Sequence, residues 1–162
     1  MDEFDEDTYA PAALDIPDYE TLLDMHDDGF NLCDLRVAPR KLESWNSSFK
    51  GLVTPFFAVK CHPDAKIVDS LRKSTICKCG FDCASAEEMA MCSDPGRTVY
   101  ANPQKSVAGI RYAIENGVRN MTFDCCEELD KVAGVVRAWG EEHREGAGMV
   151  FMIARLLVPD GR

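Results

Sequence analysis

Short apolar runs alternate with segments of helical periodicity over residues 54–162, and this alternation constrains the fold more than any other feature of the sequence. Strands that alternate with helices form parallel sheets in which the helices are the crossover connections. No glycine-rich phosphate loop follows the first strand, so the signature of a dinucleotide-binding fold is missing. We therefore expect an α/β fold with strands at 54–60, 80–84, 98–101, 120–123 and 149–157, and helices at 64–72, 85–92, 107–115 and 127–139.

The negative charge of the chain is concentrated at its N-terminus. Lys and Arg number 18 against 28 Asp and Glu, a net charge of -10, and residues 1–28 contain many acids but no Lys or Arg. The remainder is close to neutral, which argues against nucleic acid as a partner, because phosphate binding needs a basic face. We expect a solvated, flexible acidic arm at 1–28, with a docking tail as the alternative. A lead-in strand (30–35) and helix (40–49) follow at 29–53, and the main domain covers 54–162.

The cysteine spacing and the short apolar runs indicate the cellular compartment of the protein and whether it binds a metal. No secretory signal is visible, and the apolar runs are too short to span a bilayer. Eight cysteines in such a chain are expected to be reduced thiols in a cytoplasmic protein. Cys61-His62 with Cys77, Cys79 and Cys83 could supply zinc ligands, but the chain has no CxxC pair. Free thiols are therefore favoured, and no metal is predicted.

A polar residue lies at or near the carboxyl end of every predicted strand from residue 54 onward. In a (β/α)8 barrel this edge is where catalytic groups gather. Strand ends are also polar simply because loops begin there. Five chemically capable residues at five strand ends favour a functional site, and they are Lys60, Asp82, Asn102, Asp124 and Arg155.

Lys60 is the residue best suited to covalent chemistry. An amine at the end of an apolar strand is partly dehydrated, which favours a nucleophile able to form a Schiff base with a carbonyl substrate or with pyridoxal phosphate (PLP). The alternative is a solvated surface lysine.

Three other candidate residues lie near the strand ends. Asp82 ends the neighbouring strand, about 5 Å away, and could orient the amine or move its proton. Glu88 follows Ser85 at capping-box spacing, so a structural role competes with a catalytic one. Arg155 could bind a ring or a carboxylate, or end its strand in solvent.

The motifs TPFFAVKC, GFDCAS, YANPQK and MTFD, followed in this order by a strand that ends in Arg, resemble those of the ornithine/diaminopimelate/arginine decarboxylases. The eukaryotic-type ornithine decarboxylases of this fold-type III PLP family are the most similar branch. The resemblance covers about residues 29–162. It implies a TIM-like (β/α)8 barrel, of which this chain would supply about five strands. Phe57 and His62 depart from the Tyr and Asn that are usual in the family.

The resemblance also implies roles for individual residues. Lys60 matches the lysine that holds PLP, Asp82 and Glu88 match acids of the active site, and Arg155 matches an arginine near the cofactor ring. The implied activity is decarboxylation of a basic amino acid, above all L-ornithine to putrescine in polyamine biosynthesis. A homodimer of the full-length parent and an antizyme-like regulator at 115–137 are further implications. The strand at 30–35 would belong to a second, β-rich domain.

The resemblance implies that this chain supplies only part of the family's barrel. The family's glycine-rich phosphate loop and several catalytic groups lie beyond the position of Arg162, and five strands cannot close an eight-stranded barrel. We therefore expect a fragment that is inactive alone and marginally stable or prone to aggregation. The alternatives are a catalytically dead regulatory protein that resembles the antizyme inhibitors, and a relative of the diaminopimelate or arginine decarboxylases.

Overall fold

The computed structural model describes residues 19–143 and 148–156 and divides the chain into two compact units, 1–33 and 34–162. In the first unit the described residues contain helix α1 (Tyr19–Met25), which lies within the predicted acidic arm. Residues 1–18 of that arm lie outside the described residues. The strand predicted at 30–35 is wrong: these residues form no strand, and Leu32 is exposed. A strand needs a partner for its backbone groups, and none of the described residues pairs with this segment.

The second unit alternates helices with strands, as the sequence predicts. Its first helix begins three residues before the predicted helix at 40–49, because Pro39 is tolerated in a first helical turn. The predicted strand at 54–60 is shortened to three residues, and a 3-10 turn follows it. The elements are α2 (Val37–Phe49), β1 (Phe56–Ala58), η2 (Val59–Cys61), α3 (Ala65–Lys73), β2 (Gly80–Cys83), α4 (Ala86–Cys92), η3 (Pro95–Arg97), β3 (Thr98–Tyr100), α5 (Val107–Glu115), β4 (Asn120–Phe123), α6 (Cys126–Glu142) and β5 (Phe151–Ala154).

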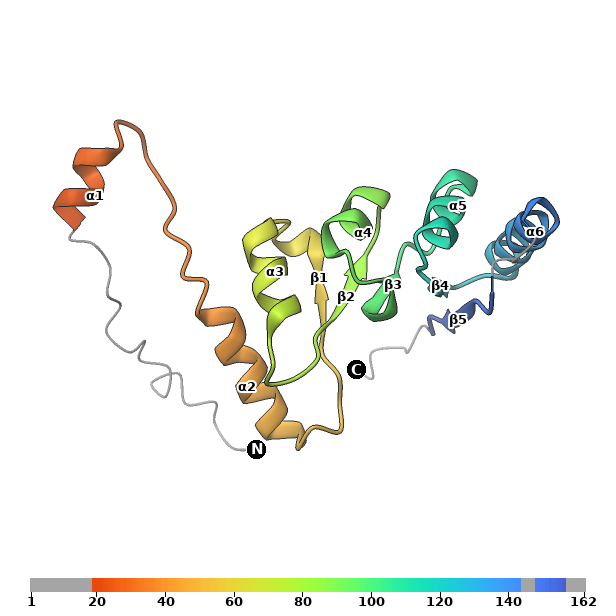
Figure 1. The fold of residues 1–162 in the computed structure, drawn as a ribbon, viewed down its shortest axis with the longest axis horizontal. Helices are drawn as coiled ribbons and strands as arrows, with labels where there is room; N and C mark the ends of the chain where they lie inside the picture. The colour runs from red at the N-terminus through yellow and green to blue at the C-terminus, as the bar shows by residue number, and fades with distance from the viewer. Residues whose placement is uncertain (1–18, 144–147, 157–162) are drawn as a thin grey trace, which may run out of the picture. The chain divides into compact units, whose positions relative to one another are not determined.

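The five strands form one parallel sheet in the order β1-β2-β3-β4-β5. Each strand pairs with its neighbour in the sequence, and helices α3 to α6 stand in a row along one side of the sheet (Figure 1). Consecutive parallel strands with helices on one side are the wall of a (β/α)8 barrel. The predicted α/β class and the partial barrel are thereby confirmed. Within the described residues β1 and β5 are the two edge strands, so the wall is open.

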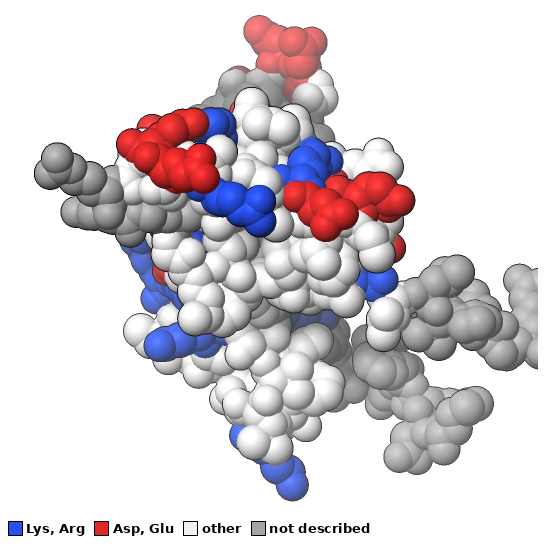
Figure 2. Space-filling model, turned by 90° about the vertical axis from the view of Figure 1, so that its right-hand side faces the viewer, with Lys and Arg blue, Asp and Glu red and all other residues white. Residues whose placement is uncertain are grey.

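The two faces of the sheet differ in burial. Phe81, Cys83 and Met121 point to the helix side, where they are fully buried in one core with residues of α3 to α6. Side chains alternate along a strand, so the intervening residues point to the opposite face. There Phe56 and Phe151 are 50% and 54% exposed. Seen from the side of α6 and β5, charged side chains gather on the upper part of the molecule and a largely uncharged area lies below (Figure 2). The face that would line a closed barrel therefore exposes apolar side chains on both edge strands, β1 and β5.

The element boundaries follow local sequence signals. The Asp64 carboxylate accepts hydrogen bonds from two backbone N–H groups in the first turn of α3, and the Ser106 hydroxyl accepts one from the Gly109 backbone N–H in the first turn of α5. Gly117 lies at φ +81°, a conformation that favours glycine, and it ends the α5 region before β4. Both α5 and β4 have the predicted bounds, whereas α6 extends past the predicted Trp139. No helix of the described residues is long and apolar enough to cross a membrane.

Candidate active site

Lys60 lies at the carboxyl edge of the sheet, but its surroundings differ from those expected. The strand was expected to run to Lys60 and to dehydrate its amine. Instead β1 ends at Ala58, buried Val59 anchors the turn η2, and the Lys60 side chain is exposed. The expectation of a partly dehydrated amine is therefore wrong for this structure, because Lys60 lies in the turn η2 and not in the strand. Within the described residues no hydrogen bond or ion pair holds the Lys60 amine.

Asp82 lies on the strand next to that of Lys60. Its register partner in β1 is Ala58, two residues before Lys60, and its side chain is on the open face of the sheet. The residue is half-buried, and its Oδ1 is buried without a hydrogen-bond partner in the described residues. A buried acceptor without a donor costs about 1–3 kcal/mol. No hydrogen bond or ion pair joins Asp82 to Lys60 in the described residues, so this oxygen remains available to a group that carries a donor.

Glu88 is occupied by the helix cap that its spacing predicts. The Ser85 hydroxyl accepts a hydrogen bond from the Glu88 backbone N–H at 3.3 Å. The Glu88 Oε2 accepts a hydrogen bond from the Ala84 backbone N–H at 2.8 Å, one residue earlier than in the standard capping box. The carboxylate therefore fixes the loop between β2 and α4, next to Asp82. The structural role is present, and a catalytic role for Glu88 stays a proposal.

The remaining predicted residues lie at the same edge without contacting one another. The Arg155 backbone N–H donates to the Phe123 carbonyl at 2.8 Å, which continues the pairing of β5 with β4, and the Arg155 side chain is exposed. Asp124 is exposed after β4. The Asn102 side chain donates to the Ala84 carbonyl at 3.4 Å, so it ties the loop after β3 to the loop after β2. In the described residues Arg155 and Asp124 are thus brought to the edge but not into a shared contact.

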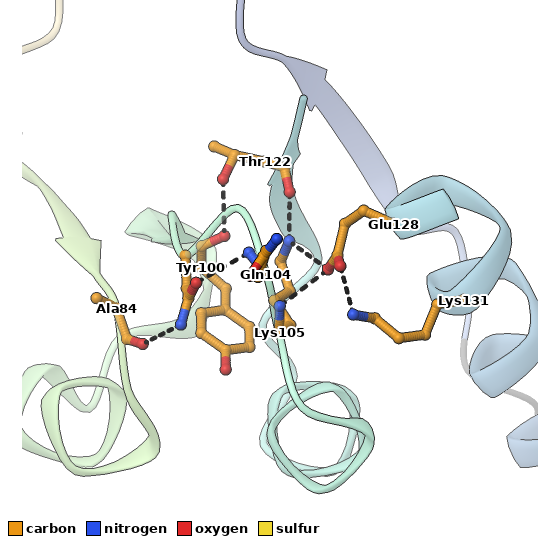
Figure 3. Close-up of polar contacts among 8 residues, drawn as sticks. Ala84, Tyr100, Gln104, Lys105, Thr122, Glu128 and Lys131 are labelled. Atoms are coloured by element: carbon orange, nitrogen blue, oxygen red, sulfur yellow. Dashed lines mark hydrogen bonds and ion pairs between the residues drawn. The ribbon is translucent and has the colours of Figure 1, made fainter. Parts of the chain in front are cut away.

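Lys105 and Glu128 form a buried ion pair at this edge that the sequence interpretation missed (Figure 3). Lys105 is only 2% exposed, and its Nζ lies 3.3 Å from Glu128 Oε1 and also donates to the Thr122 carbonyl. The Lys105 backbone N–H donates to the same Oε1 at 3.0 Å, and Lys131 pairs with Oε2. The loop after β3 is thereby attached to the end of β4 and to the first turn of α6.

The charges of this pair follow from burial and hydrogen bonding. Burial lowers the pKa of Lys105 more than the nearby Glu128 carboxylate raises it. Burial pushes the pKa of Glu128 upward, but hydrogen bonds from Lys131 and Lys105 outweigh burial and leave that pKa below its ordinary value. The only signal in the sequence was that Lys105 ends the motif YANPQK and Glu128 follows MTFD. Neither residue lies at the carboxyl end of a predicted strand, so the pattern of polar residues at strand ends did not indicate them.

The cysteine residues considered for zinc are dispersed. Cys61 is exposed, whereas Cys79 and Cys83 are buried. Among the residues that the structure describes, no group of three or more His, Cys, Asp or Glu side chains could hold a metal ion.

Comparison with known proteins identifies the family. Residues 35–145 match the family described as pyridoxal-dependent decarboxylase, pyridoxal binding domain. The chain is 42% identical to the ornithine decarboxylase of Schizosaccharomyces pombe over 109 residues, which cover 65% of this chain and 24% of that protein. It is 43% identical to the Rattus norvegicus ornithine decarboxylase over 110 residues, or 65% of this chain and 23% of the relative. The chain thus spans about a quarter of the length of these relatives.

A solved structure supports the fold assignment independently. The lysine decarboxylase from Selenomonas ruminantium superposes with a TM-score of 0.70 at 26% identity, over 86% of this chain and 35% of that one. The family description confirms PLP as the cofactor predicted from the sequence.

Lys60 and Asp82 are suited to bind the aldehyde group of PLP. The Lys60 amine is exposed and has no partner among the described residues, and the Asp82 Oδ1 is a buried acceptor without a donor. Both lie where a (β/α)8 barrel collects its catalytic groups. The chain therefore belongs to the pyridoxal-dependent decarboxylases, and its residues 35–145 match their pyridoxal-binding domain.

Proposed function

We propose that this protein takes part in PLP-dependent decarboxylation of a basic amino acid, with L-ornithine as the substrate and putrescine as the product. The observation that carries the proposal is that the Lys60 amine, which has no partner in the described residues, follows β1, while the orphan acceptor of Asp82 lies on the adjacent strand β2. The similarity to ornithine decarboxylases of about 40% identity supports the choice of substrate. Polyamine biosynthesis would then be the pathway, and the cytoplasm the compartment.

We assign the following roles to the residues of the chain. Lys60 holds the cofactor through its amine and releases the product. Asp82 keeps a proton close to that amine, since its Oδ1 has no competing donor in the described residues. When bound, PLP supplies the electron sink that allows the substrate to lose carbon dioxide. Glu88 assists proton movement only if its carboxylate can leave the Ala84 backbone N–H. Arg155, which follows β5, would contact the cofactor ring.

The test is reductive trapping of the cofactor. The chain is incubated with PLP, reduced with borohydride and digested, and the pyridoxyl group is located by mass spectrometry. We expect the adduct on Lys60, and we expect Lys60→Arg to abolish it. Lys66→Arg is the matched control, because Lys66 is an exposed lysine six residues away in α3. Adducts spread evenly over the surface lysines would contradict the proposal.

Two partners belong to the same proposal. A homodimer of the full-length parent would complete the active site, and an antizyme-like regulator would bind at 115–137. The regulator site is supported by the exposed side chains of Glu115, Glu127 and Asp130, which leave the outer surface of this region accessible. Size-exclusion chromatography with and without antizyme tests the contact, and a Glu115→Lys variant that binds antizyme as well as the wild type would weaken this assignment.

The catalytically dead regulatory homologue remains the second candidate. Its supporting observation is that Glu88 is already committed to the helix cap. A protein that binds antizyme but accepts no PLP at Lys60 would favour it over the enzyme.

A further inference from the structure

Cys83 and Cys92 form the closest approach of two thiols in the described part of the chain. Their Sγ atoms lie 3.5 Å apart, and both residues are fully buried. Cys83 is the last residue of β2, and Cys92 is the last residue of α4. The contact therefore joins the strand that carries Asp82 to the helix whose first turn holds Glu88.

The contact between the two thiols also affects their ionisation. One thiol donates a hydrogen bond to the other, and this bond raises the pKa of Cys83 and lowers the pKa of Cys92. Cys92 is thus the better nucleophile of the two, because the thiolate is the reactive form. A disulfide needs its sulfur atoms at about 2.05 Å, which a modest movement from van der Waals contact achieves.

Local opening gives an oxidant access to Cys92. The helix α4 has only seven residues, too few for independent stability, and Cys92 is at its C-terminus. The next residue, Ser93, lies at φ +51°, a left-handed conformation that is unfavourable for a residue other than glycine. A transient opening at the end of this short helix would expose the Cys92 thiol.

We propose that Cys83 and Cys92 are a redox-sensitive thiol pair, which a hydroperoxide oxidises to a disulfide. The Cys92 thiolate attacks the hydroperoxide, takes up one oxygen as sulfenic acid, and releases an alcohol or water after protonation. The Cys83 thiol then attacks the Cys92 sulfur, the disulfide forms, and the sulfenic oxygen leaves as water. Two thiols lose two electrons and two protons in total, and the hydroperoxide is the oxidant that accepts them.

The disulfide would also act on the candidate active site. Cys83 lies between Asp82 and Ala84, and the Ala84 backbone N–H is the donor to Glu88. Drawing Cys83 toward α4 would therefore shift Asp82 and the Ala84 backbone N–H that holds Glu88. This consequence rests on the proposed function, whereas formation of the disulfide does not.

The test maps the bond in the intact chain. The protein is treated with hydrogen peroxide, remaining thiols are alkylated in denaturant, and the chain is digested with trypsin. Cys83 and Cys92 fall in one tryptic peptide, residues 79–97, and a second digestion after glutamate separates them unless a disulfide holds the fragments together. We expect the fragments to stay joined until a reductant is added, and fragmentation between Cys79 and Cys83 assigns the sulfur.

Two variants and one further readout complete the test. Cys92→Ser should abolish the link, and Cys79→Ser should retain it, because burial raises the pKa of Cys79 to about 11 and its thiol donates to the Gly80 carbonyl instead. If Cys83 and Cys92 remain alkylatable while the exposed Cys125 and Cys126 are oxidised, the proposal is overturned. Borohydride trapping of PLP on Lys60 before and after oxidation measures the consequence separately. A mapped disulfide with unchanged trapping supports the bond and removes only its link to the site.

Discussion

At the scale of single residues, Asp82 indicates a functional position, because its side chain lowers the stability of the fold. A carboxylate on the open face of the sheet, with one buried oxygen that no described residue satisfies, destabilises the folded state. A protein selected only for stability would have an apolar or β-branched residue here. Its presence is the kind of local conflict that marks a functional position.

Replacing this carboxylate is expected to stabilise the fold and harm the site. Asp82→Val removes the unsatisfied oxygen and adds a residue that favours strands, so we predict a gain of about 1 kcal/mol in the free energy of unfolding. The gain appears as slower proteolysis of the native chain, and PLP trapping at Lys60 falls. Asp130→Val, at an exposed position of α6, is the control and should change neither, because Asp and Val have similar helix propensities. A variant at Asp82 that is less stable than the wild type would refute this view.

Glu128 should contribute stability that depends on pH. Its pKa in the folded chain is lowered below the ordinary value of 4.5. Below that value the unfolded carboxyl binds a proton while the folded one does not, so stability is present above about pH 4.5 and is lost as pH falls through the folded pKa. Hydrogen exchange of the Lys105 backbone amide, which donates to Glu128, measures this loss.

The variant Glu128→Gln isolates that contribution. It leaves the buried Lys105 ammonium without its counter-charge, a change worth about 3 kcal/mol, so protection of the Lys105 amide should fall about a hundredfold at neutral pH. Its protection should also lose the acid dependence. Glu127→Gln, the exposed neighbour, should behave as the wild type. Equal protection in the two variants would show that the ion pair does not hold this loop.

At the scale of helices and strands, the cap on α4 tests whether Glu88 is structural. We predict that Glu88→Ala destabilises α4 by about 1 kcal/mol, because the Ala84 backbone N–H loses its acceptor. Glu88→Gln keeps an acceptor and should lose less. Hydrogen exchange of the Ala84 and Glu88 amides reports the cap, and PLP trapping reports the site. Trapping that falls in Glu88→Gln while the cap persists would assign Glu88 a role in the chemistry.

The elements show what could be predicted from the sequence. The sequence pattern predicted the bounds of α5 and β4 to the residue, and the capping-box spacing placed Ser85 at the start of α4, because these are local effects. The strand predicted at 30–35 does not form, because a strand needs a partner that is distant in the sequence, and the local sequence pattern does not reveal that partner. The exposure of Lys60 and the burial of Lys105 likewise depend on how strands assemble. The motifs identified the edge of the site, but not the ion pair that holds it.

At the scale of the whole molecule, the open wall of strands determines behaviour in solution. In the part of the chain that the structure describes, the outer edges of β1 and β5 are unpaired, and the exposed side chains of Phe56 and Phe151 present apolar surface to water. We predict that the isolated chain self-associates and shows no sharp, concentration-independent melt. Light scattering during thermal unfolding at several protein concentrations measures this. A monomer with a single cooperative transition would contradict the prediction.

The central claim is that the fold makes Lys60 the anchor for PLP, and the most direct test compares the folded chain with the unfolded one. Borohydride trapping is carried out in buffer and in urea, and the adduct on every lysine is quantified. The account predicts that Lys60 carries most of the pyridoxyl group in buffer and loses this preference in urea. The same distribution over all lysines in both conditions would show that the structure confers no special reactivity on Lys60.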